Sequence, residues 1–187
     1  DLSGPDGTPD GKIDNHDQVV IGHPVYPRMT FGLTPSAKWK GFDLSLFFQG
    51  SAIVSRDIGN FYTVAFENNK SNTSYEYYNN HWTPDNENAK YPKANTSPSS
   101  NNTQVSDFWI VNTSHLRLKT AVLGYTLPAS ITQFLTLKNI RVYCSGQNLF
   151  TLSNLKHTDP ENSEFGSRET VSYPNMKTIT FGASVTF

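Results

Sequence analysis

The feature that most constrains this chain is the strict two-residue alternation of its last eleven residues, 177–187. The apolar parity consists of Ile179, Phe181, Ala183, Val185 and Phe187, and the other parity is mostly Thr, Ser and Gly. Such alternation is typical of a β-strand with one apolar and one polar face. A chain that ends on an apolar strand with a terminal aromatic residue favours the closing seam of an outer-membrane β-barrel, with its small hydroxyl face toward the lumen.

Composition and charge limit the alternatives. The 187 residues are 36% hydrophobic and 13% aromatic, with a formal net charge of -1. This charge offers no basic field for nucleic acid, so no nucleic-acid partner is expected. No apolar run approaches the ~18 residues of a membrane-spanning helix. The single cysteine, Cys144, excludes an intramolecular disulfide and is expected to act as a small hydrophobe. The chain is therefore all-β, either soluble or part of a membrane barrel.

The same alternation predicts five antiparallel strands of one sheet, at 29–39, 42–51, 114–126, 138–150 and 176–187. Each arm of the first hairpin has about ten residues, which at ~3.3 Å per residue and ~45° tilt covers roughly 23 Å, close to the apolar band of a bilayer. Pro35 forfeits one ladder hydrogen bond, which predicts a local bulge. The apolar parity slips near Thr120, which predicts a second bulge.

Short and long connections alternate along the chain. Lys40 and Gly41 form a tight turn, and residues 128–137 form a short connector with a helical turn. The long connections are 52–113, in which 75–82 is expected to be helical, and 151–175. Outer-membrane barrels have short turns at one rim and long extracellular loops at the other. The expected aromatic girdle at the short-turn rim comprises Trp39, Phe42, Tyr125 and Phe187.

An Asp- and Gly-rich segment, within residues 1–28, has the spacing of a calcium-binding loop. Counted from Asp6, oxygen donors occupy loop positions 1, 3, 5, 7, 9 and 12, and Gly11 at position 6 permits the sharp turn. The predicted ligands are Asp6, Thr8, Asp10, the Lys12 carbonyl, Asp14 and Asp17. A loop of Asx turns that binds no metal is the alternative.

Several independent strings occur in one order along the chain, at 19–24, 41–50, 82–92, 116–119, 123–128 and 145–151, followed by the final Phe-containing strand. Together they resemble the C-terminal end of SusC/RagA-type TonB-linked outer-membrane transporters. The resemblance covers nearly the whole chain and implies the last five strands of a transmembrane barrel of about 22 strands. The N-terminal plug of such transporters has no counterpart here, so the chain is expected to be a C-terminal piece of a longer protein.

The resemblance also implies a function and partners. It predicts a segment of an active importer of oligosaccharides or peptides in the outer membrane of a Gram-negative bacterium, and not an enzyme. The implied partners are the rest of the barrel and its plug, the lipid bilayer, a SusD-like surface lipoprotein that acts as a lid, and TonB through the N-terminal part.

Two groups of residues are candidates for the function. The first long loop supplies aromatic side chains expected to contact the substrate or the lid, namely Tyr62, Tyr77, Tyr78 and Trp82. A second group lies on one face of a strand and is expected to line the lumen, where it would attract polar substrates or balance carboxylates; it consists of His115, Arg117 and Lys119.

Two other function classes stay open. A soluble carbohydrate-binding β-sandwich would stack the aromatic residues of 52–113 on sugar rings. An outer-membrane enzyme would need clustered acids and a histidine, for which the sequence offers His157, Asp159 and Glu161 at a generic spacing. The sequence contains no HExxH, GxSxG, GxGxxG, P-loop or CxxC motif, which favours a non-catalytic role.

Overall fold

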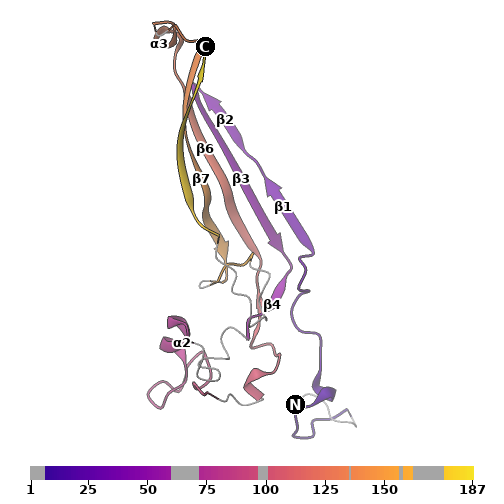
Figure 1. The fold of residues 1–187 in the computed structure, drawn as a ribbon. Helices are drawn as coiled ribbons and strands as arrows, with labels where there is room; N and C mark the ends of the chain where they lie inside the picture. Colours follow the sequence, from indigo (N-terminus) through magenta and orange to yellow (C-terminus); the bar gives the residue numbers. More distant parts are fainter. Residues whose placement is uncertain (1–6, 60–71, 97–100, 135, 156–157, 162–174) are drawn as a thin grey trace.

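The computed structural model describes residues 7–59, 72–96, 101–134, 136–155, 158–161 and 175–187. A long, twisted antiparallel sheet dominates it, and the long connections gather at one end of this sheet (Figure 1). Its strands are β1 (Met29–Leu33), β2 (Ser36–Trp39), β3 (Phe42–Ala52), β6 (His115–Thr126), β7 (Asn139–Ser153) and β8 (Thr178–Thr186). Both β1 and β2 pair with β3, and the order continues through β6 and β7 to β8. The all-β fold and the predicted strand order are confirmed.

The strand predicted at 29–39 is divided into β1 and β2, and the bulge predicted at Pro35 is wrong. Leu33 pairs with Phe48 and Ser36 pairs with Ser45. Two residues therefore separate the two ladders on the β1–β2 side and two on the β3 side, so the register does not shift. Proline has no N–H and interrupts a ladder without needing an extra residue. The Pro35 carbonyl still accepts a hydrogen bond from the Leu46 N–H at 3.0 Å.

The bulge predicted near Thr120 is confirmed. Leu118 pairs with Phe48 and Thr120 with Phe47, so Lys119 is an extra residue against β3. On its other side β6 also changes register against β7 between Leu118 and Thr120. This insertion explains why the apolar parity of β6 slips while its apolar side chains stay on one face of the sheet.

The register separates an apolar face from a polar face. One cross-strand row consists of Leu44, Leu123, Cys144 and Phe181. The adjacent row, on the opposite face, consists of Ser45, Val122, Ser145 and Thr180. The described residues leave the apolar face largely uncovered, since Leu123 is 51% exposed and Phe181 79% exposed. An uncovered apolar surface that follows four long strands is larger than water-soluble monomers present.

The short connections lie at the end of the sheet opposite the long ones (Figure 1). Lys40 and Gly41 have φ values of 46° and 86°, which a two-residue hairpin turn of the primed type requires. Helix α3 (Ala129–Phe134) lies in the connection from β6 to β7, which confirms the predicted helical turn. At this end the rings of Phe42 and Tyr125 are 4.5 Å apart, and Trp39 pairs with Phe42. The aromatic row is therefore present at the short-turn rim.

The connection from β3 to β6 has structure of its own. It contains a two-stranded ladder of β4 (Ser55–Asp57) with β5 (Ile110–Asn112), helix α2 (Tyr75–Asn80) and a 3-10 turn, η3 (Asn101–Thr103). A second 3-10 turn, η1 (Asn15–Asp17), precedes the sheet. The predicted helix at 75–82 thus ends two residues early, because His81 already has an extended backbone. A small core of Ile58, Tyr77, Tyr91 and Trp109 holds these pieces together. Among the described residues, no helix combines the length and the apolar character needed to cross a membrane.

The two edges of the sheet lack partner strands within the described part of the chain. One edge is formed by β1 and β2, and the other by β8. Each edge presents a row of backbone N–H and C=O groups that point away from the sheet. An unpaired edge of this kind can accept a further strand by backbone hydrogen bonding.

Candidate functional site

The polar face of β6 carries three basic side chains at the end of the sheet near the long connections. His115, Arg117 and Lys119 alternate with Leu116 and Leu118, and the latter pair with apolar partners on the opposite face. The structure therefore brings together the three residues that the sequence predicts for one strand face. Arg117 is only 3% exposed, although arginine is rarely buried without a partner.

The partners of these basic groups come from a segment 42 residues further along the chain. Arg117 is paired with Asp159 through its Nη2 atom, and its Nη1 lies 3.4 Å from Glu161 Oε2. Lys119 Nζ donates to Glu161 Oε2 at 2.7 Å, and His115 Nε2 lies 3.4 Å from Glu161 Oε1. We call these five residues the Arg117 cluster. It fixes the described segment 158–161 to the polar face of the sheet.

The cluster favours the ionised form of Asp159. Burial acts to raise the pKa of Asp159, but hydrogen bonds from Arg117 and from the Glu161 and Asn175 N–H groups outweigh it, so the pKa is lowered. A lowered pKa means that the contact stabilises the folded loop above the ordinary aspartate pKa of about 4. This stabilisation is lost as the pH falls through the lower pKa of the folded state.

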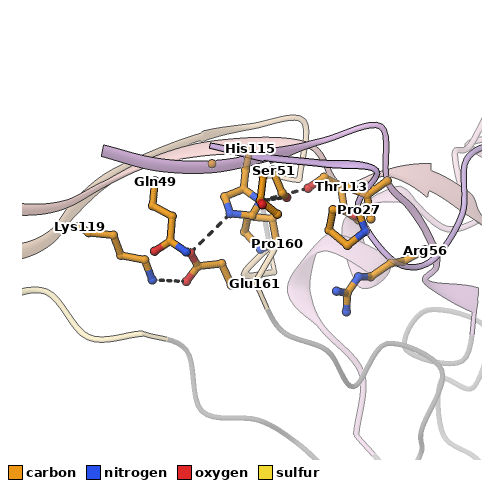
Figure 2. Close-up of a pocket in the computed structure, with 12 residues that line it drawn as sticks. Pro27, Gln49, Ser51, Arg56, Thr113, His115, Lys119, Pro160 and Glu161 are labelled. Carbon is orange, nitrogen blue, oxygen red and sulfur yellow. Dashed lines mark hydrogen bonds and ion pairs between the residues drawn. The ribbon is translucent and has the colours of Figure 1, made fainter. Parts of the chain in front are cut away.

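A cavity of about 360 Å³ lies beside the Arg117 cluster. Figure 2 shows its wall, to which β3 contributes Ser51, β4 contributes Arg56 and β6 contributes His115. Thr113, between β5 and β6, also lines it and is 1% exposed, yet its Oγ1 has no hydrogen-bond partner among the described residues. A buried hydroxyl is normally hydrogen-bonded, so a water molecule or another polar group is expected to accept from Thr113 Oγ1.

A second ion pair crosses the polar face near the short turns. Arg141 on β7 donates to both oxygens of Asp43 on β3, at 2.9 and 2.6 Å. Its guanidinium also lies 5.2 Å from the ring centre of Tyr143. Gly124 on the intervening strand leaves the space, since a Cβ there would lie 2.4 Å from the Arg141 side chain. This ion pair links β3 to β7 across the intervening strand β6. The sequence analysis did not identify it.

The aromatic candidates of the first long loop fall into different environments. Tyr77 is 3% exposed, donates from its hydroxyl to the Pro92 carbonyl at 2.9 Å and stacks on Tyr91, so its ring belongs to the loop core. Tyr78 is 63% exposed and Trp82 is 36% exposed, so both can reach a ligand or partner. Tyr62 lies outside the described residues.

The predicted calcium loop uses several of its carboxylates in local turns. Asp14 caps η1, and its Oδ1 accepts from the His16 N–H at 2.8 Å. Asp17 Oδ2 accepts from the Asp14 N–H at 2.8 Å, and Asp10 Oδ1 accepts from the Lys12 N–H at 2.9 Å. These contacts are those of Asx turns and a capping box, which also occur in loops without metal.

Calcium binding stays a prediction. Asp6 lies outside the described residues and Thr8 is exposed; the described part of the chain holds no group of three acidic, His or Cys side chains arranged for a metal. If the predicted site forms, calorimetry of the intact protein should show calcium binding that Asp10→Ala weakens by about tenfold or more, because a charged ligand is lost. Asp85→Ala, which removes another exposed carboxylate, is the control. Equal calcium affinity in all three proteins would reject the site.

Sequence analysis identified the basic half of the Arg117 cluster but not its acidic half. Asp159 and Glu161 were expected only as weak candidates for an enzymatic site, together with His157. The structure pairs both carboxylates with Arg117 and Lys119, and His157 lies outside the described residues. The sequence shows two acidic residues two positions apart in a polar loop. This pattern does not indicate which strand their side chains contact.

Curated relatives cover nearly the whole chain. TonB-dependent receptor P26 of Formosa agariphila is 34% identical over 192 residues, which covers 95% of this chain and 19% of that protein. TonB-dependent receptor SusC of Bacteroides thetaiotaomicron is 29% identical over 181 residues, covering 95% of this chain and 17% of SusC. No protein-family model matches the chain.

Solved structures agree with these relatives. The RagAB peptide importer in its closed-closed state matches with a TM-score of 0.71 and 26% identity, over 98% of this chain and 20% of that chain. Over nearly its whole length, the chain is similar to SusC/RagA-type TonB-dependent receptors. The structure of the RagAB peptide transporter supports the same resemblance, with a TM-score of 0.66 and 28% identity over 87% of this chain and 17% of that chain.

The chain spans about a fifth of the length of the curated relatives it matches. The all-β fold predicted from the alternation, and the family resemblance predicted from the order of short strings, are confirmed over this length. The strand number of the complete barrel stays a prediction.

Proposed function

We propose that this segment forms part of the wall of an outer-membrane, TonB-dependent importer of oligosaccharides or peptides. The observation that carries the proposal is the division of the sheet into an apolar face and a mostly polar face. The row of Leu44, Leu123, Cys144 and Phe181 is apolar and uncovered, and the next row bears mostly hydroxyl groups on the other face. A barrel wall between lipid and an aqueous lumen needs this division.

In this proposal the polar face, with the Arg117 cluster, lines the lumen. The edges at β1, β2 and β8 pair with strands of the rest of the receptor, because each unpaired backbone group in lipid costs several kcal/mol. The short turns face the periplasm and the long connections face the cell exterior. Substrate passing through the barrel then meets charged and polar groups that come from β3, β6 and segment 158–161.

The partners follow from the family. The solved neighbours are described as a RagAB peptide importer and transporter, and a relative is SusC. We propose that the receptor works with a SusD-like surface lipoprotein as a lid and takes energy from TonB through its N-terminal part. The exposed rings of Tyr78 and Trp82 on the long connection are candidates for contacts with the lid or the substrate.

The alternatives receive less support from the geometry. A β-sandwich needs a second sheet packed on the apolar face, and none of the described elements lies there. An enzyme with Asp159 and Glu161 as catalytic acids would need at least one carboxyl free to exchange protons. Both are instead held by Arg117 and Lys119.

Uptake by cells tests the proposal. Deletion of the receptor gene in its Gram-negative host should abolish removal of a particular set of labelled oligosaccharides or peptides from the medium. Complementation with the intact receptor should restore it, and a protonophore should block it because TonB-linked import requires energy. Identical uptake profiles of the deletion and parent strains across both compound classes would contradict the proposal.

A further inference from the structure

We propose that the short-turn rim of the sheet binds the phosphate head groups of anionic phospholipids through Lys40 and Lys138, an inference that rests on the proposed function as part of a barrel wall. The two lysines lie in the two short connections, at the end of the sheet opposite the long ones (Figure 1). Both are exposed. When the apolar face of the strands lies in the hydrocarbon of a bilayer, the head groups surround the ends of the strands.

Charge is distributed unevenly along the strands. The half of the sheet nearest the short turns consists of residues 36–47, 120–147 and 178–187. Of the 16 acidic residues of the chain, this half contains only Asp43. The same half contains four cationic residues, namely Lys38, Lys40, Lys138 and Arg141. It is therefore locally positive although the whole chain is nearly neutral, and it matches an anionic surface.

The single carboxylate of this half is engaged on the polar face. Arg141 donates to both oxygens of Asp43, and Lys38 is the cross-strand neighbour of Asp43 on β2. Neither Lys40 nor Lys138 forms an ion pair with any residue in the described part of the chain. The charges of these two lysines are thus available to an anion from outside the chain.

Lys40 lies against the apolar side of the rim. Its Nζ is 5.0 Å from the ring centre of Trp39. Trp39 pairs with Phe42 and Phe42 pairs with Tyr125, two positions along the strands from the row of Leu44, so these rings belong to the apolar face. Trp39 is 68% exposed and can contact the upper part of an acyl chain. The ammonium beside it keeps N–H donors for phosphate oxygens.

Lys138 has a similar setting at the second short connection. Its N–H donates to the Thr186 carbonyl at 2.9 Å, which fixes its backbone just before β7. It precedes Ile140, a residue of the apolar face, by two positions. Helix α3, which leads into this position, exposes 88% of Phe134. A lysine close to an exposed aromatic side chain at the end of apolar strands is typical of the membrane interface.

An anionic phospholipid fits both properties of this rim. Its phosphate pairs with the lysines, and its acyl chains cover the exposed rings of Trp39 and Phe134. A soluble anion would pair with the lysines but leave the rings in water. A zwitterionic lipid would cover the rings, but its own cation opposes the positive charge of the rim. We therefore expect the rim to select the anionic lipid from a mixture.

The test uses the intact receptor in vesicles that contain phosphatidylglycerol and phosphatidylcholine with identical acyl chains, one of which is brominated. With Cys144 replaced by alanine, Leu123→Cys carries a bimane label on the apolar face of β6, the strand between β3 and β7. Bromine quenches the label, so the quenching reports which lipid lies beside it. Phosphatidylglycerol should be enriched there, and Lys40→Gln and Lys138→Gln should each lower the enrichment by about three- to fivefold, the effect of one lysine near an anionic surface.

Lys177→Gln is the matched control, because it removes an exposed lysine at the other end of the sheet, just before β8. It should leave the enrichment unchanged. Inorganic phosphate, added at constant ionic strength, should also leave it unchanged, because free phosphate has no acyl chains to cover the rings. Loss of the enrichment on addition of phosphate would assign the lysines to a soluble anion and overturn the lipid site.

Two further results separate this inference from the proposed function. Equal quenching by the two brominated lipids, or an enrichment that survives Lys40→Gln combined with Lys138→Gln, would overturn the lipid site and leave the lysines to an acidic partner protein. Quenching by neither lipid would show that Leu123 does not face lipid, which would contradict the barrel wall itself.

Discussion

Replacement of Arg117 by methionine is expected to destabilise the intact receptor around the loop by about 3–5 kcal/mol, because it leaves the half-buried carboxylate of Asp159 without its cation and removes one of the cations beside Glu161. Arg117 is 3% exposed, so water cannot replace the guanidinium. The Glu161 N–H, which donates to Asp159 Oδ1 at 3.0 Å, reports on the segment. Hydrogen exchange measured by mass spectrometry should become faster over 158–161 by two orders of magnitude or more, as roughly 1.4 kcal/mol corresponds to tenfold.

A thermodynamic cycle separates the ion pair from a general loss of packing. Asp159→Asn removes one of the carboxylates that Arg117→Met leaves without a cation. The double mutant should therefore lose less stability than the sum of the losses in the two single mutants. Arg28→Met is the control for loss of an exposed arginine and should leave exchange over 158–161 unchanged. Additive effects of the two single changes would show that the pair does not hold the loop.

Introduction of arginine at Phe181 is expected to destabilise the receptor in a bilayer by about 2–4 kcal/mol, the cost of a cation on the lipid face near the middle of a barrel strand. The neighbouring change Thr180→Arg places the same charge on the polar face, where water solvates it, and should cost less than about 1 kcal/mol. Unfolding of the intact receptor by denaturant in lipid vesicles measures both values.

The comparison is decisive because both residues lie on β8 and both are exposed in the described chain. In a water-soluble sheet, arginine at an exposed phenylalanine position would be tolerated as well as arginine at an exposed threonine position. Equal tolerance of the two changes would therefore contradict a lipid-facing sheet.

The strands could be predicted because the physical cause of their pattern is local. When one face of a strand meets apolar surroundings and the other meets water, the polarity of each residue depends only on whether its position is odd or even along the strand. This alternation is visible in the sequence. Even the bulge at Lys119 was visible as a slip in parity. The effect of Pro35 could not be predicted in this way. The sequence shows that proline lacks an N–H, but whether an extra residue forms a bulge depends on the pairing with β3.

The site could be predicted only in part because its contacts are not local. The three basic residues share a strand and so a face, but Asp159 reaches Arg117 across 42 positions. The Arg141 and Asp43 pair spans 98 positions and also leaves no local signal. The core of the first long loop likewise gathers Ile58, Tyr77 and Trp109 from separate segments without any period. Charge and aromatic content identify such residues as candidates, and only the fold assigns their partners.

The central claim is that the two faces of this sheet meet lipid and water, respectively. With Cys144 replaced by alanine, single cysteines at Leu44 and Ser45, adjacent on β3 and on opposite faces, can carry spin labels in the intact receptor reconstituted in a bilayer. Collisional relaxation should show that the label at position 44 is accessible to oxygen, which concentrates in lipid, and that the label at position 45 is accessible to a water-soluble nickel chelate. Equal access of both reagents to both labels would contradict a barrel wall.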